Sequence, residues 1–267
     1  MTITETEQLE LLSVAHELAD VARVETLKYF RTSGLSVSNK EQDSFDPVTE
    51  ADRASERAMR DILAKRRPND GILGEEYGTQ EGTSGLTWVL DPIDGTRAYI
   101  SGTASWGVLI GLDAGNGPVL GIVDQPFTGE RFLGGFGQSI WIRGTESRQM
   151  KTRDCARLAD AILYTTFPEV GTEAEGAAFK RVSKKCKLTR YGLDCYAYAL
   201  IGLGMVDMVI ESGLLAYDVQ GPIAVVEAAG GIVTNWQGGP AHNGGQIIAA
   251  GDARIHAQAL EILSKVS

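Results

Sequence analysis

A stretch in the middle of the chain constrains the fold most strongly. From Trp106 to Ile142, short apolar runs alternate with turn signals at residues 115–118 (GNGP) and 128–130 (TGE). Apolar runs of this length, separated by turns rich in glycine and proline, are typical of consecutive antiparallel strands. The sequence therefore predicts an antiparallel meander.

Helices are expected before this meander. Apolar residues at intervals of three and four predict an amphipathic helix over residues 6–30. Its apolar positions are Leu9, Leu12, Ala15, Ala19, Ala22 and Leu27. A second helix is predicted from Thr49 to Arg66, since Pro68-Asn69-Asp70-Gly71 would end it. A short strand, Thr87–Leu90, should follow and stop at Asp91-Pro92.

The second half of the chain alternates strands with helices. Strands are predicted at 161–166, 208–210, 232–235 and 246–249, and helices at 173–184, 195–203, 222–229 and 254–265. Such alternation favours sheets sandwiched between helical layers. Because residues 151–159 are polar, we expect them to join two parts. These would be an N-terminal α+β subdomain over 1–150 and a C-terminal α/β subdomain over 151–267.

Net charge and cysteine content limit the classes of function that the chain can have. The formal net charge of −10 disfavours a nucleic-acid partner. The same charge suits an enzyme of anionic phosphate esters only if carboxylate-bound divalent cations reverse the local sign. No secretory signal or membrane-spanning stretch is expected. Three cysteines (Cys155, Cys186 and Cys195) without C-x-x-C spacing argue against a disulfide framework or a zinc site, and they indicate a reduced, cytoplasmic protein.

The most informative local segment is Trp88–Arg97, with the sequence WVLDPIDGTR. Asp91 ends a buried strand, and Asp94 follows closely enough for both carboxylates to face one ion. Gly95 and Thr96 can open a turn or helix whose free N–H groups meet a phosphate. Taken alone, the segment fits equally well a turn at Asp94-Gly95 with Asp91 as a helix cap.

Three other acidic stretches also have purely structural explanations. Paired acids such as Glu75 and Glu76 are usually solvated. Residues 46–52 fit a helix N-terminus with acids in its first turn. Asp218 precedes a predicted helix that has Pro222 near its start, where a carboxylate would serve as a cap.

Taken in order, these motifs resemble the inositol monophosphatase family. They are G-E-E at 74–76, W-x-x-D-P-I-D-G-T at 88–96, and Y-D-V at 217–219 before a helix that ends E-A-A-G-G at 227–231. The resemblance extends from about residue 10 to the C-terminus. It implies a layered α-β-α-β-α sandwich, dependence on two or three Mg²⁺ ions and, commonly, a homodimer.

The resemblance also implies roles for single residues, most of them in the N-terminal part. The implied metal ligands are Glu75, Asp91, Ile93 (through its carbonyl), Asp94 and Asp218. Gly95 and Thr96 match the phosphate-binding amides, and the Thr96 hydroxyl with Glu75 would orient the attacking water. Lys40 and Asp52 lie near the lysine and aspartate of an early motif, although the spacing at Lys40 differs from some members. Metal-activated water would then attack phosphorus in line, without a covalent intermediate.

The substrate is indicated by other positions. The sequence around Arg97 and the stretches at 45–53 and 191–198 most resemble the histidinol-phosphate phosphatase branch of the family. Its leaving group is cationic, which Asp194 and Glu211 would suit. Glu211 also matches a position that contacts substrate hydroxyls, and Asp194 has an alternative role as a helix cap. The expected substrate-binding residues are Asp94, Gly95, Thr96, Arg97, Asp194 and Glu211.

One departure from the family pattern stands beside the expected metal site. Residues 220–222 are Gln-Gly-Pro, where small residues such as alanine are typical. A change at this position can reshape the substrate pocket, and the sequence alone does not determine its effect. The favoured hypothesis is hydrolysis of histidinol phosphate to histidinol and phosphate in histidine biosynthesis. The alternative is an inositol monophosphatase or broad sugar-phosphate phosphatase, and a remote one is a non-catalytic regulator that binds metal or phosphate.

Overall fold

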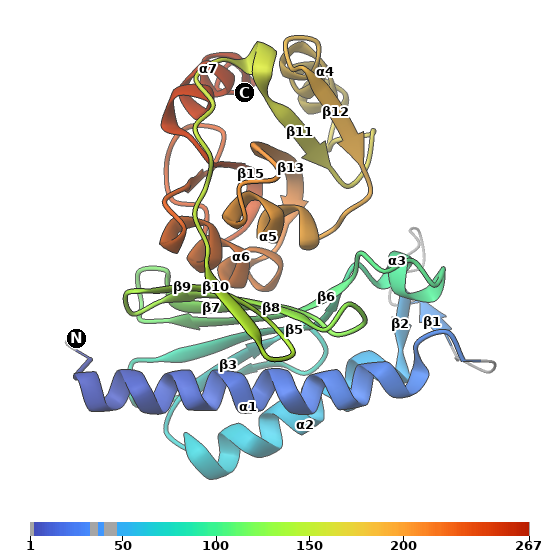
Figure 1. Ribbon diagram of the computed structural model, residues 1–267. Coiled ribbons are helices and arrows are strands. Elements are labelled where there is room, and N and C mark those ends of the chain that lie inside the picture. The colour runs from blue at the N-terminus through green and yellow to red at the C-terminus, as the bar shows by residue number, and fades with distance from the viewer. Residues whose placement is uncertain (1–2, 33–36, 40–46, 267) are drawn as a thin grey trace.

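The computed structural model describes residues 3–32, 37–39 and 47–266, which form five layers (Figure 1). Helices α1 (Glu5–Tyr29) and α2 (Glu50–Arg66) cover one face of an eight-stranded sheet. Helices α5 (Tyr196–Gly202) and α6 (Ala216–Ala228) lie between this sheet and a five-stranded one. Helices α4 (Glu173–Ser183) and α7 (Ala253–Leu263) form the last layer. The expected α-β-α-β-α sandwich is confirmed.

The eight-stranded sheet has the order β10-β9-β8-β7-β6-β5-β3-β4. Only β3 and β5 pair in parallel, and consecutive strands from β5 to β10 pair antiparallel. The predicted meander is thereby confirmed. The strands of the whole sheet are β3 (Gly71–Gly74), β4 (Gly78–Gln80), β5 (Thr87–Asp94), β6 (Gly107–Asp113), β7 (Pro118–Gln125), β8 (Glu130–Gly135), β9 (Gln138–Arg143) and β10 (Glu146–Gln149).

The five-stranded sheet has the order β12-β11-β13-β15-β14 and mixes parallel with antiparallel pairs. Its strands are β11 (Ile162–Thr165), β12 (Leu188–Tyr191), β13 (Met208–Leu214), β14 (Ile232–Thr234) and β15 (Gly245–Ala250). The edge strand β12 was not predicted, because it is short and largely exposed and so lacks an apolar alternation. The remaining elements are β1 (Val37–Asn39), β2 (Pro47–Thr49), α3 (Thr96–Ile100) and the 3₁₀ turn η1 (Leu158–Asp160).

Helix α1 forms where it was predicted, and four of the six apolar positions predicted for it are buried: Leu12, Ala15, Ala19 and Ala22. The other two are not. Leu9 is 67% exposed and Leu27 is 39% exposed, whereas Leu11 and Leu18 are buried. At 100° per residue, Leu9 and Leu27 lie roughly 160–200° around the helix from Leu11. They therefore point away from α2 and the sheet. The prediction that they face the core was wrong, because a leucine on a long helix does not by itself mark the buried face.

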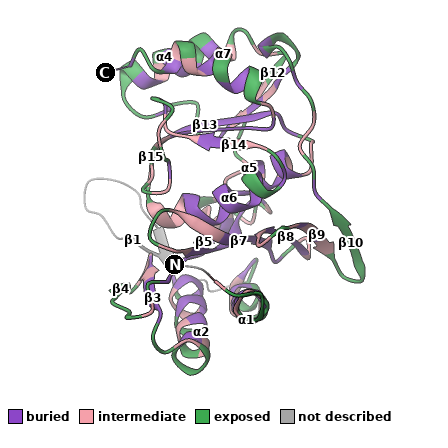
Figure 2. Cartoon of the chain, turned by 90° about the vertical axis from the view of Figure 1, so that its left-hand side faces the viewer, coloured by how far each residue is buried: buried purple, intermediate pink, exposed green. Residues whose placement is uncertain are grey.

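Helix α6 begins at Ala216 rather than near Pro222, which lies inside the helix. Proline removes one backbone donor and usually marks a boundary. Here residues from Val219 to Val226 are buried between the two sheets (Figure 2), and this packing stabilises the helix in spite of the proline. As a consequence, Asp218 lies within the first turn of α6 and not ahead of it.

A row of glycines seats α6 against the first sheet. Gly111, Gly121 and Gly134 are register partners across β6, β7 and β8. A Cβ atom at Gly121 would lie 2.4 Å from the Gly221 carbonyl oxygen, and one at Gly134 would lie 2.3 Å from a carbonyl of α6. The row thus forms a groove in which only glycine lets the helix backbone approach so closely.

The two halves of the chain are in close contact through this groove, since α6 packs on β5–β8 as well as on the second sheet. The division into subdomains at residue 150 stays a prediction. None of the described helices is long and apolar enough to cross a membrane.

Candidate active site

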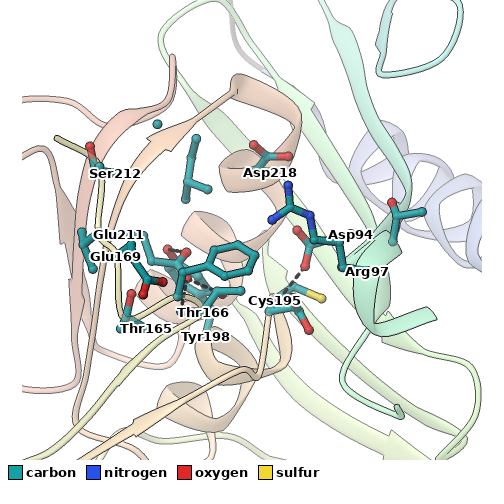
Figure 3. Close-up of a pocket in the computed structure, with 18 residues that line it drawn as sticks. Asp94, Arg97, Thr165, Thr166, Glu169, Cys195, Tyr198, Glu211, Ser212 and Asp218 are labelled. Atoms are coloured by element: carbon teal, nitrogen blue, oxygen red, sulfur yellow. Dashed lines mark hydrogen bonds between the residues drawn. The ribbon is translucent and has the colours of Figure 1, made fainter. Parts of the chain in front are cut away.

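A pocket of about 310 Å³ lies between the two sheets (Figure 3). One end, the metal end, contains Asp94 and Asp218 beside the turn of residues 94–97. The other is formed by residues 165–171 and 211–214, and it is called the leaving-group end after the role that the sequence predicts for Glu211. Elements from both halves of the chain therefore meet in one cavity.

A bulge at the end of β5 brings Asp91 and Asp94 together. Residues three apart on a regular strand point to opposite faces. Here the register between β5 and β6 shifts between Asp91 and Asp94, and the Ile93 N–H donates to Asp91 Oδ1 at 3.0 Å. The irregularity turns both carboxylates toward the same point.

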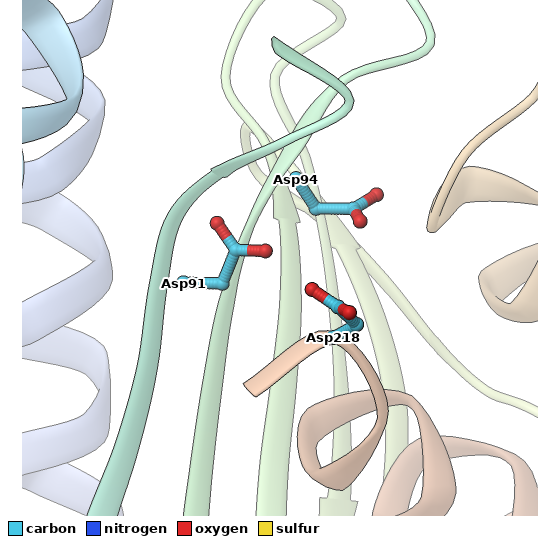
Figure 4. Close-up of side chains that lie close together, drawn as sticks. All are labelled: Asp91, Asp94 and Asp218. Carbon is cyan, nitrogen blue, oxygen red and sulfur yellow. The ribbon is translucent and has the colours of Figure 1, made fainter. Parts of the chain in front are cut away.

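Asp218 joins this pair from the first turn of α6 (Figure 4). One oxygen from each of Asp91, Asp94 and Asp218 lies within 4.8 Å of the others. Glu75 follows β3, which runs parallel to β5, and its N–H donates to the Leu90 carbonyl at 3.1 Å. The negative charge of Glu75 raises the pKa of both Asp91 and Asp218, which places Glu75 beside the cluster.

Burial is the main cause that raises the pKa of Asp91 and Asp94 well above the usual range, followed by repulsion from neighbouring carboxylates. The pKa of Asp218 rises to about 7, again chiefly through burial. Carboxylates so placed cannot all ionise without a counter-charge. Because all the candidate ligand atoms are carboxylate oxygens, the cluster fits a hard divalent cation such as Mg²⁺ or Ca²⁺.

The turn after the cluster has the geometry expected for phosphate binding. Gly95 adopts φ +82°, and α3 begins at Thr96, so the first amides of α3 lack intrahelical partners. A Cβ at Gly95 would lie 2.7 Å from Asp194 Cγ, so glycine is required there on two grounds. The Thr96 hydroxyl donates to the Ile93 carbonyl at 3.2 Å, which holds that expected ligand next to Thr96.

Asp52 has two roles in the structure. Its Oδ2 accepts the Thr49 N–H at 2.9 Å and the Thr49 hydroxyl at 2.6 Å, which caps α2. Burial, with the charges of Glu75 and Glu76, raises its pKa to about 7, so it also faces the acidic cluster. Among the described residues, no hydrogen bond reaches its buried Oδ1. Lys40 lies outside the described residues.

Asp194 is not a helix cap. Helix α5 has Cys195 at its N-cap without a side-chain cap bond, and the Cys195 N–H donates to Asp94 Oδ2 at 2.6 Å. Asp194 instead adopts φ +49° and accepts the Ser105 hydroxyl at 2.6 Å. Its carboxylate lines the pocket beside Gly95, and burial raises its pKa. The capping alternative is therefore wrong.

Glu211 lines the pocket, but the protein itself engages both of its oxygens. Oε1 accepts the Thr166 N–H at 3.0 Å and the Thr166 hydroxyl at 2.6 Å, and Oε2 accepts the Tyr198 hydroxyl at 2.9 Å. Glu211 thus fixes the end of β11. Sequence reasoning missed Thr166 and Tyr198. The two threonines that end the predicted strand 161–166 were the available signal, because polar residues at strand ends often line sites.

The Gln-Gly-Pro departure does not reach the pocket. The Gln220 amide donates to Asp113 Oδ2 at 2.9 Å and to the His242 carbonyl at 3.2 Å. The described residues that line the pocket include none of residues 220–222. The Gln220 side chain leaves α6 on the side facing β6, away from the residues that line the pocket.

Comparisons with known proteins agree with this geometry. The profile of the inositol monophosphatase family matches residues 7–267. The chloroplastic bifunctional phosphatase IMPL2 of Arabidopsis thaliana is 40% identical over 98% of this chain and 77% of that protein. A histidinol-phosphatase of Streptomyces coelicolor is 33% identical over 96% of this chain and 98% of that protein.

Among solved structures, an inositol monophosphatase from Zymomonas mobilis superimposes with a TM-score of 0.85 at 40% identity, covering 98% of this chain and 99% of that one. The family profile spans nearly the whole chain, and the relatives named here are phosphatases. The chain therefore belongs to the inositol monophosphatase family and is a phosphoric monoester hydrolase.

Proposed function

We propose that this enzyme hydrolyses histidinol phosphate to histidinol and phosphate with Mg²⁺. The observation that supports this most directly is Asp194, a half-buried carboxylate that Ser105 holds beside the phosphate-binding turn. Glu169 and Glu211 add further carboxylates toward the leaving-group end. A pocket lined by these negatively charged carboxylates suits an ammonium and an imidazolium better than a neutral polyol. The similarity to the Streptomyces coelicolor histidinol-phosphatase supports the same substrate.

The metal end supplies the chemistry of the proposal. Glu75, Asp91, Asp94 and Asp218, with the Ile93 carbonyl, would hold Mg²⁺, the cation that best matches an all-oxygen site in a phosphoryl-transfer enzyme. Bound there, such ions lower the pKa of a water molecule and neutralise phosphoryl oxygens.

The protein groups around that site position the reactants. The amides of Gly95 and Thr96 bind the phosphate, while the Thr96 hydroxyl and Glu75 orient the water for in-line attack. Asp52 lies close enough to the acidic cluster to assist from the N-terminus of α2. Lys40 keeps the role that the family resemblance implies, as a proposal.

A second candidate is hydrolysis of inositol or other sugar phosphates, which the structural similarity to the Zymomonas mobilis inositol monophosphatase favours. A panel separates the two, with histidinol phosphate, inositol 1-phosphate, fructose bisphosphate and a nucleotide phosphate assayed side by side. We expect histidinol phosphate to have the highest kcat/KM. Preferential turnover of inositol 1-phosphate would replace the first proposal with the second.

Asp194→Asn tests the feature on which the proposal rests. Loss of one negative charge beside a cationic substrate should raise KM for histidinol phosphate about tenfold, and KM for inositol 1-phosphate should change much less. Equal losses with both esters would mean that Asp194 supports the phosphate-binding turn instead of recognising the leaving group.

We further propose a homodimer, which the family resemblance supports and which size-exclusion chromatography with light scattering would test.

The cysteines at 155, 186 and 195 are free thiols, which supports a reducing compartment such as the cytoplasm.

A further inference from the structure

The connection between β11 and α4 forms one wall of the leaving-group end, and it is held at both ends. At its start, Thr166 donates twice to Glu211. At its end, the Thr172 N–H donates to Glu175 Oε2 at 2.6 Å, and Glu175 in turn accepts the Ser212 hydroxyl at 2.7 Å. The residues between, 167–171, are therefore presented to the pocket from fixed anchors.

Phe167 stands in this wall with 46% of its surface exposed, although it is a large apolar side chain. The guanidinium carbon of Arg97, which reaches the pocket from α3, lies 5.0 Å from the centre of the Phe167 ring. Figure 3 shows Arg97 entering from the side of the first sheet, opposite Glu169. A planar cation thus already lies on this aromatic face, an arrangement that the ring quadrupole favours.

Glu169 differs from the other carboxylates of this end. Both oxygens of Glu211 accept hydrogen bonds from the protein. In the described part of the chain, no hydrogen bond or ion pair engages the Glu169 carboxylate, although it lines the same pocket. An exposed carboxylate next to an exposed aromatic ring is a suitable pair of contacts for a ligand that has both a flat ring and a cationic amine.

We propose that Phe167 and Glu169 form the subsite for the leaving group. The Phe167 ring stacks on the imidazole, in contact with the Arg97 guanidinium or in its place, and the Glu169 carboxylate pairs with the ammonium group. The proposal rests on the proposed function, because it assumes an aromatic amino alcohol as leaving group. It assigns specificity to a loop that none of the sequence motifs includes.

The test compares histidinol phosphate with glycerol 2-phosphate, a phosphate monoester that has neither ring nor amine. Phe167→Leu keeps apolar bulk but removes the aromatic face, and Glu169→Gln removes only the charge. Each should raise KM for histidinol phosphate about tenfold with little change in kcat, and leave KM for glycerol 2-phosphate within about twofold. Phe167→Tyr, which keeps the aromatic ring, should have a KM for histidinol phosphate close to the wild-type value.

Phe127→Leu is the matched control. Phe127 is 44% exposed and lies under the Arg31 guanidinium at 4.2 Å, so it has the same kind of contact, but it is not among the residues that line the pocket. This variant should leave both KM values unchanged. If Phe167→Leu shifts the KM of both esters equally, or shifts neither, the subsite assignment is overturned.

Competitive inhibition by L-histidinol separates failure of the subsite from failure of the proposed function. It is measured on whichever ester the wild-type enzyme hydrolyses. If histidinol phosphate is hydrolysed but the variants bind histidinol normally, only the subsite is wrong. If histidinol phosphate is not hydrolysed, yet histidinol inhibits and Phe167→Leu weakens this about tenfold, only the function is wrong. Absence of both turnover and inhibition would overturn both.

Discussion

At the metal end of the pocket, Asp91, Asp94 and Asp218 crowd their oxygens within 4.8 Å of one another, and burial raises their pKa values. At the leaving-group end, Glu211 is also buried, but both of its oxygens accept hydrogen bonds from Thr166 and Tyr198. Each carboxylate of the first group accepts one backbone N–H, from Ile93, Cys195 or Leu215, whereas Glu211 accepts three hydrogen bonds. The three crowded carboxylates therefore keep oxygens that a cation can use, and those of Glu211 are already engaged. Available donors, more than burial, therefore separate a ligand-binding carboxylate from a structural one.

The largest expected effect comes from removing one charge at the metal end. Asp91→Asn should reduce kcat about 10³-fold or more, because one of the expected Mg²⁺ ligands loses its negative charge. The metal-free variant should be at least as stable as the metal-free wild type, since the substitution relieves repulsion. Steady-state kinetics and thermal unfolding measure the two effects. Activity near the wild-type level would refute the metal-based mechanism.

The glycine row offers a way to move Asp218 without changing it. In Gly121→Ala, the new Cβ would lie 2.4 Å from the Gly221 carbonyl oxygen, so α6 must shift away from the sheet. We expect a loss of about 1–3 kcal/mol in the free energy of unfolding and a Mg²⁺ affinity about 30-fold weaker. Denaturant unfolding and metal titration measure these changes.

Gly176→Ala is the matched control for this variant. Its Cβ would meet no atom closer than 3.4 Å, and it lies inside α4, where alanine favours the helix. It should leave Mg²⁺ affinity unchanged. An unchanged affinity in Gly121→Ala as well would show that the seating of α6 does not determine the metal end.

The metal end should also give the enzyme a characteristic pH dependence. Asp52 and Asp218 have folded-state pKa values of about 7, above the ordinary value of 3.8. Folding of the metal-free protein thus takes up protons, so its stability is highest below about pH 4 for these groups and falls as pH rises through 7. Metal binding requires the ionised forms, so Mg²⁺ affinity should fall about tenfold from pH 8 to pH 6. Scanning calorimetry of the metal-free protein measures the first pH dependence, and titration calorimetry with Mg²⁺ measures the second. Stability that rises with pH, or Mg²⁺ affinity that falls with it, would contradict the role of Asp52 and Asp218.

The smallest effect is expected at the leaving-group end. Glu211→Gln replaces one acceptor oxygen with an N–H₂ donor that faces donors from Thr166 or Tyr198, so the start of the β11–α4 connection should loosen. KM for histidinol phosphate should rise about fivefold, with kcat and Mg²⁺ affinity nearly unchanged. A large loss of Mg²⁺ affinity would instead assign Glu211 to the metal end. Tyr198→Phe, which removes a single hydrogen bond, should give a weaker effect of the same kind.

Much of the candidate site was predictable because it is local in sequence. Asp91, Asp94 and the turn at Gly95-Thr96 lie within one short segment, and a β-rich run that stops at D-P-I-D-G-T constrains its own geometry. Glu75 was predictable only through the family resemblance, since paired acids alone usually indicate a solvated surface. The positions of Leu9 and Leu27 on α1 and the start of α6 were predicted wrongly, because each depends on which neighbours the element packs against.

The sequence by itself determined the meander, the alternating second half and the carboxylates available to a metal, because these follow from hydrophobic periodicity and from chemical residue type. Only the tertiary structure decided what each carboxylate does. The bulge in β5 turned Asp91 and Asp94 to one side, and the aligned glycines placed Asp218 opposite them. The contacts around Glu211 and Phe167 likewise come from strands and helices far apart in the chain, and no local pattern specifies which of these meet.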